Sequence, residues 1–215
     1  MMTTLCKNDT LLFLGDSITD CGRDRLDATD LGKGFSAFVA AHLAAEYPDA
    51  NLSFVNRGIS GNKIRDILNR IEEDCIDLKP DLLIFLIGIN DTWRNIGTSS
   101  FGTPEATATF ASDYRQFLQQ VTESGIKKIL LLEPFVLPYP ADRKQWRKDL
   151  DPKIHSIREL AAEFGCDYLP LDGLFAERTV KKHSSYYTGE DGVHPTIAGH
   201  GVIAQEILRR IHYSR

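Results

Sequence analysis

The sequence predicts an α/β fold, in which a parallel sheet lies between two layers of helices. Short apolar runs alternate along the chain with amphipathic helical patterns, as in βαβ units. The runs "LLIFLI" and "KILLLE" are apolar at almost every position, which is typical of strands covered on both faces. A chain of 215 residues is long for one domain but does not require two. We therefore expect one domain, 1–215, with a three-layer α-β-α architecture.

Five apolar segments are the expected strands. Their connections carry helical patterns, so consecutive strands should run parallel and end at a common edge of the sheet. Polar and glycine-rich residues follow several of them, and long loops at that edge of such a sheet usually form the functional site. The expected strands are Leu11–Leu14, Leu52–Val55, Leu82–Ile87, Lys128–Leu132 and Tyr168–Leu171.

Four helices are indicated by apolar residues that recur at i, i+3, i+4 and i+7. The third is expected to begin at Asp151-Pro152 and to end at Gly165, and Thr196 is expected to cap the fourth. The apolar stripes are Ile64, Ile67, Leu68 and Ile71; Phe110, Tyr114, Phe117, Leu118 and Val121; Ile154, Ile157, Leu160 and Phe164; and Ile197, Ala204, Leu208 and Ile211.

The composition narrows the possible partners and the cell compartment. A net charge of -5 argues against a nucleic-acid or anionic-membrane partner and suits a small neutral molecule. No segment approaches the ~20 apolar residues of a membrane span, and the first residues do not read as a signal peptide. The four cysteines are scattered, without a C-x-x-C pair. We expect a cytoplasmic protein without a disulfide framework or a zinc site.

Four short blocks carry the residues of interest. "GDSITD", "VNRGISGN" and "GINDTW" each follow an expected strand, so they should meet at one edge of the sheet. The fourth block, "DGVHP", lies just before the last helix. Taken singly, each block has an ordinary structural explanation as a turn, a cap or a surface loop.

Together the blocks contain what acyl transfer requires. Ser17 would be the nucleophile, which needs a base to take its proton. His194 is the natural base, and Asp191, three residues earlier, can hold the imidazole and stabilise its charged form. The N–H groups of Ser17 and Gly61 and the side-chain amide of Asn90 are the candidate donors of an oxyanion hole.

Two further positions are assigned from their neighbours. Trp93 follows the Asn90 block and is expected to form a wall of the substrate pocket, although it could equally pack beneath the loop. Asp16 is expected to orient the turn at Ser17 and, with Trp93, to contribute to substrate binding. The charged segment "DRKQWRKD", 142–149, is expected to be a solvated, partly helical surface; a lid or a subunit contact is the alternative.

Other site types fit the sequence less well. The nucleophile elbow G-x-S-x-G is absent, as are the Rossmann and Walker A patterns after the first strand. His183, His194 and His200 match no zinc-ligand spacing, so we expect no metal site.

The four blocks resemble those of the SGNH, or GDSL, hydrolase superfamily, and the resemblance extends from Leu11 to the last helix. Ser17, Gly61, Asn90 and His194 match its four name-giving residues, and Asp191 matches the acid of its D-x-x-H motif. The resemblance implies a flavodoxin-like fold with a five-stranded parallel sheet, and ester hydrolysis through an acyl-serine intermediate without a cofactor.

Longer stretches are similar to intracellular bacterial acetylxylan esterases, namely "LLFLGDSITDCGR", "VNRGISGNKIRDI", "IGINDTWR" and "DGVHPTIAGH". This similarity implies removal of acetyl groups from xylan fragments, and assembly into a homo-oligomer. That subgroup would have an aromatic residue directly before the acid, where this chain has Glu190.

We therefore expect an esterase that acts on short-chain esters, with acetylated xylo-oligosaccharides or related sugars as substrates. A lysophospholipase or thioesterase of the same superfamily is the alternative enzyme. A non-catalytic carbohydrate-binding module is a further alternative, but such a module has no need of Ser17, His194 and Asp191 together.

Overall fold

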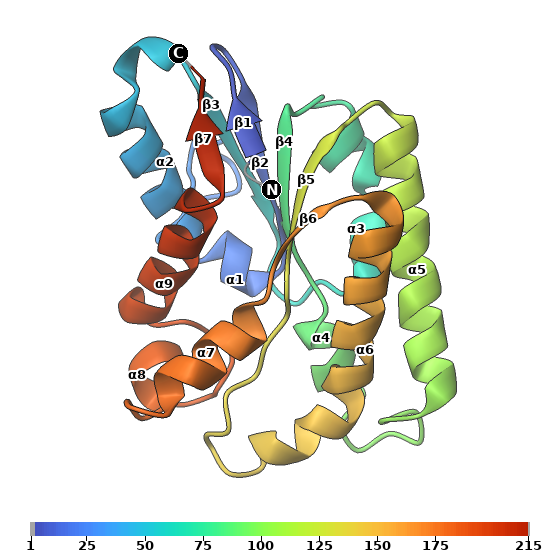
Figure 1. The fold of residues 1–215 in the computed structure, drawn as a ribbon. Coiled ribbons are helices and arrows are strands. Elements are labelled where there is room, and N and C mark those ends of the chain that lie inside the picture. Colours follow the sequence, from blue (N-terminus) through green and yellow to red (C-terminus); the bar gives the residue numbers. More distant parts are fainter. Residues whose placement is uncertain (1–2, 215) are drawn as a thin grey trace.

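The computed structural model describes residues 3–214. Its main sheet is parallel and has five strands in the order β3-β2-β4-β5-β6, with helices on both faces (Figure 1). This arrangement confirms the predicted three-layer α/β fold. The strands are β2 (Thr10–Gly15), β3 (Ser53–Gly58), β4 (Leu82–Leu86), β5 (Lys128–Leu132) and β6 (Asp167–Leu169).

The helices divide between the two faces of the sheet. One face packs against α2 (Phe35–Glu46), α7 (Leu171–Thr179) and α9 (Ile197–Leu208). The other packs against α3 (Ile64–Leu68), α5 (Pro104–Glu123) and the later turns of α6 (Arg143–Phe164). The shorter elements are α1 (Ser17–Asp20), α4 (Ile89–Trp93), α8 (Ser185–Thr188), a 3₁₀ turn (Pro48–Ala50) and a π-helical turn (Glu72–Ile76).

Strand β2, which lies between β3 and β4, shows why the apolar runs are continuous. Leu11 and Phe13 point into the core on the α2 and α9 side, whereas Leu12 and Leu14 point into the core on the α3 and α5 side. All four side chains are at most 1% exposed. Burying a side chain of this size contributes about 1.5–3 kcal/mol, so both faces of the strand must be apolar.

A second, two-stranded parallel sheet joins segments from opposite ends of the chain, β1 (Thr3–Leu5) and β7 (Ile211–Tyr213). The last helix was predicted to include Ile211, and this was wrong because α9 ends at Leu208. The helical spacing of Ile211 is coincidental, since this residue is buried in the pairing with Thr3 rather than on the helix stripe.

The third predicted helix also differs from the observed one. α6 begins at Arg143, and Pro152 lies inside it rather than at its start. A proline inside a helix costs about 3 kcal/mol because it removes a hydrogen bond and crowds the preceding turn. The first turns of α6 offset this cost by burying Trp146 and Leu150, which are 3% and 0% exposed.

The expectation of a solvated surface at 142–149 was therefore wrong for part of the segment. Trp146 lies in the core, and Asp149 is buried in an ion pair with Lys153, one turn later on α6. Both partners of this pair are 1% exposed. The segment is therefore packed into the domain, which argues against the alternative of a lid.

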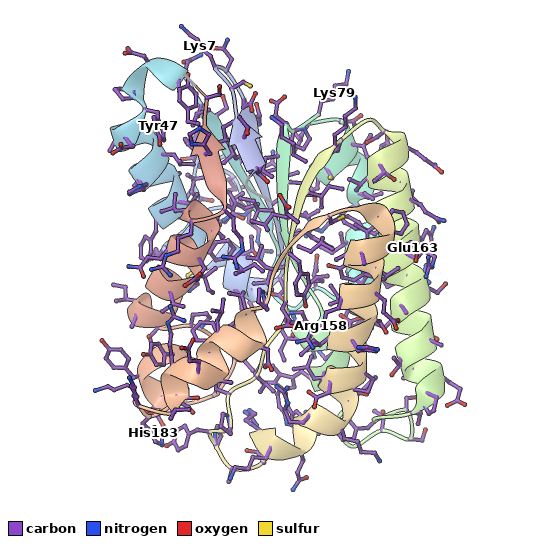
Figure 2. All side chains as sticks on the ribbon, viewed as in Figure 1. Lys7, Tyr47, Lys79, Arg158, Glu163 and His183 are labelled. Atoms are coloured by element: carbon purple, nitrogen blue, oxygen red, sulfur yellow. The ribbon has the colours of Figure 1, made fainter. Side chains whose placement is uncertain are left out.

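Figure 2 helps to locate the two ends of the sheet. Lys7 and Lys79 precede β2 and β4 and are labelled at one end of the molecule, whereas His183, before α8, is labelled at the other. The strands therefore run toward the end that carries α4 and α8 (Figure 1). None of the helices within residues 3–214 has the length and apolar character needed to cross a membrane.

Candidate active site

The carboxyl ends of three adjacent strands bring the first three blocks together. β2 is the middle strand, and its last residue, Gly15, is in register with Gly58 of β3 and Leu86 of β4. The chain segments that follow these residues therefore leave the sheet side by side. They carry Ser17, Gly61 and Asn90, as the sequence predicts.

Ser17 is held at the tip of β2 by a tight turn. A β-carbon added to Gly15 would lie 2.3 Å from the Leu86 carbonyl oxygen, so only glycine fits at the end of β2. Asp16 then caps α1, with its Oδ1 accepting a hydrogen bond from the Ile18 N–H at 3.0 Å. This cap fixes the backbone on both sides of Ser17.

Asp16 itself has no exposed surface. Burial raises the pKa of its carboxyl to about 7, despite the hydrogen bond from Ile18 and the nearby charge of His194. The expectation that Asp16 orients the turn agrees with this placement. The expectation that it contributes to substrate binding was wrong, because a side chain without accessible atoms cannot touch a substrate.

The fourth block reaches Ser17 from the other end of the sequence. The Oγ atom of Ser17 lies 2.8 Å from Nε2 of His194, and Nδ1 of His194 lies 2.5 Å from Oδ2 of Asp191. The Oδ1 atom of Asp191 accepts the N–H groups of Val193 and His194 at 2.8 and 2.9 Å. The spacing of three residues therefore lets one carboxylate hold both the loop and the imidazole.

These contacts set the charge states of the pair. The hydrogen bond to Asp191 raises the pKa of His194 above its ordinary value, although partial burial opposes the shift. Burial would raise the pKa of Asp191, but the hydrogen bonds from His194 and from the two backbone N–H groups outweigh it and lower that pKa. A carboxylate thus faces an imidazole that can accept a proton, as a general base must.

A half-buried arginine, Arg143, holds this loop against the rest of the molecule. Arg143 Nε donates to the Asp191 carbonyl oxygen at 2.7 Å, and its guanidinium lies over the rings of Trp146 and Trp93, 4.3 and 5.6 Å from their centroids. The loop also packs closely against Tyr139 at Gly192, where only glycine fits because a β-carbon would lie 2.3 Å from the Tyr139 carbonyl oxygen. The sequence analysis did not single out Arg143, because it lies in a run of charges that is typical of a solvated surface.

The opposite side of Ser17 presents hydrogen-bond donors. Asn90 is 7% exposed, and its Nδ2 donates to the Asn62 carbonyl oxygen at 3.1 Å, which leaves one amide hydrogen for another acceptor. The Asp91 carboxylate accepts the Ile64 N–H at 3.2 Å. Helix α4 is thereby tied at two points to the segment that contains Gly61.

The Gly61 segment is also held from the α1 side. Asp20 is buried, and its Oδ2 accepts both the N–H and the hydroxyl of Ser60, at 3.0 and 3.2 Å. Gly61 follows with φ +85°, in the left-handed region that favours glycine. The bond to Asp20 was not foreseen, although Asp20 belongs to the first block.

The four blocks surround one cavity of about 430 Å³. Trp93 forms part of its wall, with its ring centroid 6.0 Å from that of His194 and 5.0 Å from that of Trp146. This places Trp93 at the pocket, where the sequence analysis put it. The lining residues are Ser17, Ser60, Gly61, Asn90, Trp93, Arg94 and His194.

A hydroxyl, an imidazole and a carboxylate in hydrogen-bonded series, facing neutral donors across a cavity, have the geometry that acyl transfer requires. The chain belongs to the GDSL-like Lipase/Acylhydrolase family, whose pattern it matches over residues 13–202. It is accordingly a carboxylic ester hydrolase of the SGNH type.

Its relatives include an acetylxylan esterase from Geobacillus stearothermophilus. The two sequences are 34% identical over 212 residues, which cover 95% of this chain and 94% of the relative. A crystal structure of that acetylxylan esterase superposes with a TM-score of 0.83 and 32% identity, over 95% of this chain and 94% of the other. Three structures of its catalytic mutants replace a serine, an aspartate and a histidine with alanine.

A crystal structure from Parabacteroides merdae, of a protein described as a GDSL-like lipase, is similar as well. It superposes with a TM-score of 0.89 and 33% identity, over 98% of each chain. The similarity to both proteins extends over nearly the whole chain, so it includes all four blocks of the site.

Proposed function

We propose that this protein, as a single domain over 1–215, removes acetyl groups from acetylated xylo-oligosaccharides or related sugars. The observation that carries the proposal is the hydrogen-bonded series Ser17–His194–Asp191 at the edge of a cavity bounded by Trp93. The similarity to an acetylxylan esterase over 95% of the chain supports the choice of substrate.

In the proposed first step, Ser17 Oγ attacks the ester carbonyl carbon while His194 Nε2 takes the hydroxyl proton. Asp191 stabilises the resulting imidazolium through Nδ1. The negative oxygen of the tetrahedral intermediate accepts hydrogen bonds from the Ser17 and Gly61 N–H groups and the Asn90 amide. The intermediate then expels the sugar oxygen, which takes the proton from His194, and an acetyl-serine remains.

In the second step a water molecule replaces the sugar. His194 removes a proton from this water, which attacks the acetyl carbonyl carbon, and the same donors hold the second oxyanion. The bond to Ser17 Oγ breaks, and the serine recovers its proton from His194. The products are acetate and the free sugar hydroxyl, and no electrons are transferred to or from another molecule.

The cavity supports a preference for a small acyl group. Its volume is about 430 Å³, which must be shared between the acyl group and part of the sugar. Trp93 can bound the acyl group or stack on a sugar ring. A lysophospholipase or thioesterase would need a longer apolar channel than these seven lining residues provide.

Hydrolysis of a graded series of esters tests the proposal. The panel contains p-nitrophenyl esters from acetate to octanoate together with acetylated and deacetylated xylo-oligosaccharides. We expect the highest kcat/KM for acetate, and release of acetate from the acetylated sugar. A kcat/KM that rises steadily to octanoate would favour the lipase-like alternative, and binding of sugar without acetate release would favour a binding module.

We also propose a homo-oligomer in the cytoplasm. Five large apolar or aromatic side chains are exposed within residues 3–214, and they are candidates for a contact with another copy. These are Leu26, Ile96, Val180, Tyr186 and Ile197, which are 97%, 40%, 84%, 51% and 79% exposed. The four cysteines are free thiols, in keeping with a reducing compartment. Light scattering that shows only the 24.1 kDa species at micromolar concentration would contradict the oligomer.

A further inference from the structure

Arg94 occupies a distinct position in the candidate active site. It follows Trp93 at the end of α4, where its N–H donates to the Asn90 carbonyl oxygen at 3.0 Å. A β-carbon built on Gly61 would lie 3.6 Å from Nη2 of Arg94, in van der Waals contact. The guanidinium therefore lies beside the glycine proposed for the oxyanion hole, and it lines the cavity that contains Ser17.

The guanidinium of Arg94 has no hydrogen-bond or ion-pair partner within residues 3–214, and this sets it apart from the other arginines of that range. Arg23 donates to the Gly58 carbonyl oxygen, and each of the remaining arginines forms an ion pair with a carboxylate. Those paired with carboxylates are Arg25, Arg57, Arg65, Arg70, Arg115, Arg143, Arg147, Arg158, Arg178, Arg209 and Arg210.

This difference is informative because the protein is acidic, with a net charge of -5. Carboxylates are plentiful, yet none pairs with the arginine that faces the cavity. The nearest acid along α4, Asp91, instead accepts the Ile64 N–H. Among the described residues that line the cavity, Arg94 is also the only one with a permanent charge, while the nearby Asp191 carboxylate is engaged by the imidazole of His194.

We propose that Arg94 binds a carboxylate on the alcohol part of the substrate, so that acetyl esters of acidic sugars are preferred over those of neutral sugars. This inference rests on the esterase function proposed above, in which the acyl group is acetyl and carries no charge. The anionic group must therefore belong to the sugar, on the ring that bears the ester or on its neighbour.

The chemistry of the guanidinium favours a carboxylate over a phosphate. Its planar set of N–H donors matches the two oxygens of one carboxylate, and a single charge neutralises it. A phosphate dianion would leave one negative charge uncompensated in this cavity, since Arg94 is its only permanent cation.

A matched set of substrates tests the proposal. The first two substrates are methyl glucoside and methyl glucuronide, each acetylated at the same ring hydroxyl. They differ only in that the glucoside has a hydroxymethyl group where the glucuronide has a carboxylate. The corresponding acetylated glucoside phosphate is the third substrate, and p-nitrophenyl acetate reports the basal esterase. The proteins are the unmodified chain, Arg94→Gln, Arg94→Lys and Arg115→Gln.

Arg115→Gln is the control for the loss of one positive charge. Arg115 pairs with Glu163 on the outer side of α5 and α6, where Glu163 is labelled in Figure 2, and it takes no part in the site. It should leave kcat/KM unchanged for all substrates. Arg94→Lys keeps the charge but loses the fork of donors, so it should retain part of the preference.

We expect the unmodified enzyme to prefer the glucuronide, and Arg94→Gln to lower kcat/KM for the glucuronide by ~10-fold, mainly through KM. The ratio of kcat/KM for the glucuronide to kcat/KM for the glucoside should fall by a similar factor, because the glucoside offers the guanidinium no anion. Added salt should weaken the preference of the unmodified enzyme.

Three results would overturn the inference. An equal fall in kcat for acidic and neutral substrates would assign Arg94 to the oxyanion hole instead, and no change for the glucuronide would leave it without a role in binding. A preference for the phosphate over the carboxylate would also contradict it. If the unmodified protein hydrolyses none of these esters, the proposed esterase function itself has failed, which is a separate outcome.

Discussion

Arg143 and Asp191 are joined through the main chain of the acid and not through its carboxylate. Arg143 Nε donates to the Asp191 carbonyl oxygen at 2.7 Å, so the Asp191 carboxylate remains free to hold His194. The same guanidinium lies over Trp93, which lines the cavity. One side chain therefore connects the pocket wall to the acid–base pair.

Arg143→Met should lower kcat by roughly tenfold, because a charge-assisted hydrogen bond of about 1.5–3 kcal/mol no longer holds the Asp191 loop. Arg143→Lys should recover only part of the loss. Lysine lacks the planar guanidinium group, which can donate to the Asp191 carbonyl oxygen and lie over the tryptophan rings at the same time. The measurement is kcat against pH for p-nitrophenyl acetate. Loosening of the Asp191–His194 contact should move the His194 inflection to lower pH.

Lys144→Met is the matched control, because Lys144 is the neighbouring residue and is exposed. It should leave both kcat and the inflection in place. If Arg143→Met alters only the melting temperature, Arg143 has a structural role without an effect on the pair.

Ser17→Ala should abolish nearly all esterase activity while the protein stays folded. Loss of the nucleophile in a serine hydrolase of this type costs roughly 10⁶-fold in kcat. Ser156→Ala provides a control, since Ser156 is a half-buried serine on α6 that does not line the cavity. Near-normal turnover of p-nitrophenyl acetate by Ser17→Ala, with an unchanged circular dichroism spectrum, would show that another group is the nucleophile.

Asp191→Asn should reduce kcat by roughly 10²–10⁴-fold, because the amide can hold the wrong tautomer of His194 and does not stabilise its charged form. Asp191 raises the pKa of His194, and the base works only when neutral, so activity of the unmodified enzyme falls as pH drops through that raised pKa. In Asp191→Asn this inflection should lie at lower pH. Part of the loss should be recovered at high pH, where hydroxide can replace the weakened base.

Asn90→Ala should lower kcat by ~10²–10³-fold with little change in KM, because its amide donates to charge that exists only in the transition state. The pH inflection should stay where it is, since Asn90 does not titrate. Profiles that shift in parallel for Asn90→Ala and Asp191→Asn would mean that at least one of the two roles is misassigned. A melting temperature checks that loss of the bond to Asn62 has not loosened α4.

The sequence was sufficient to predict the sheet and the assembly of the four blocks. Strands such as Leu82–Leu86 are apolar on both faces, and parallel strands must end at one edge, so Ser17 and Asn90 could be placed together. The D-x-x-H spacing likewise leads directly to the contact of Asp191 with His194.

The errors share a physical cause, which is that long-range packing overrode local patterns. Pro152 marks a helix start by local rules, yet buried Trp146 and Leu150 extend α6 back to Arg143. The role of Arg143 depends on a contact 48 positions away, and no local pattern in a charged segment reports such a contact. The complete burial of Asp16 follows from the turn above β2, which the tripeptide alone does not reveal.

The pairing of β1 with β7 ties together two segments from opposite ends of the described chain. Thr3 N donates to the Arg210 carbonyl oxygen at 2.7 Å, and Ser214 N donates to the Leu5 carbonyl oxygen at 3.0 Å. Neither strand can separate without exposing the other, so both should open in a single event. In hydrogen-exchange experiments, the amides of Thr3 and Ser214 should therefore report the same opening free energy, rather than fraying independently.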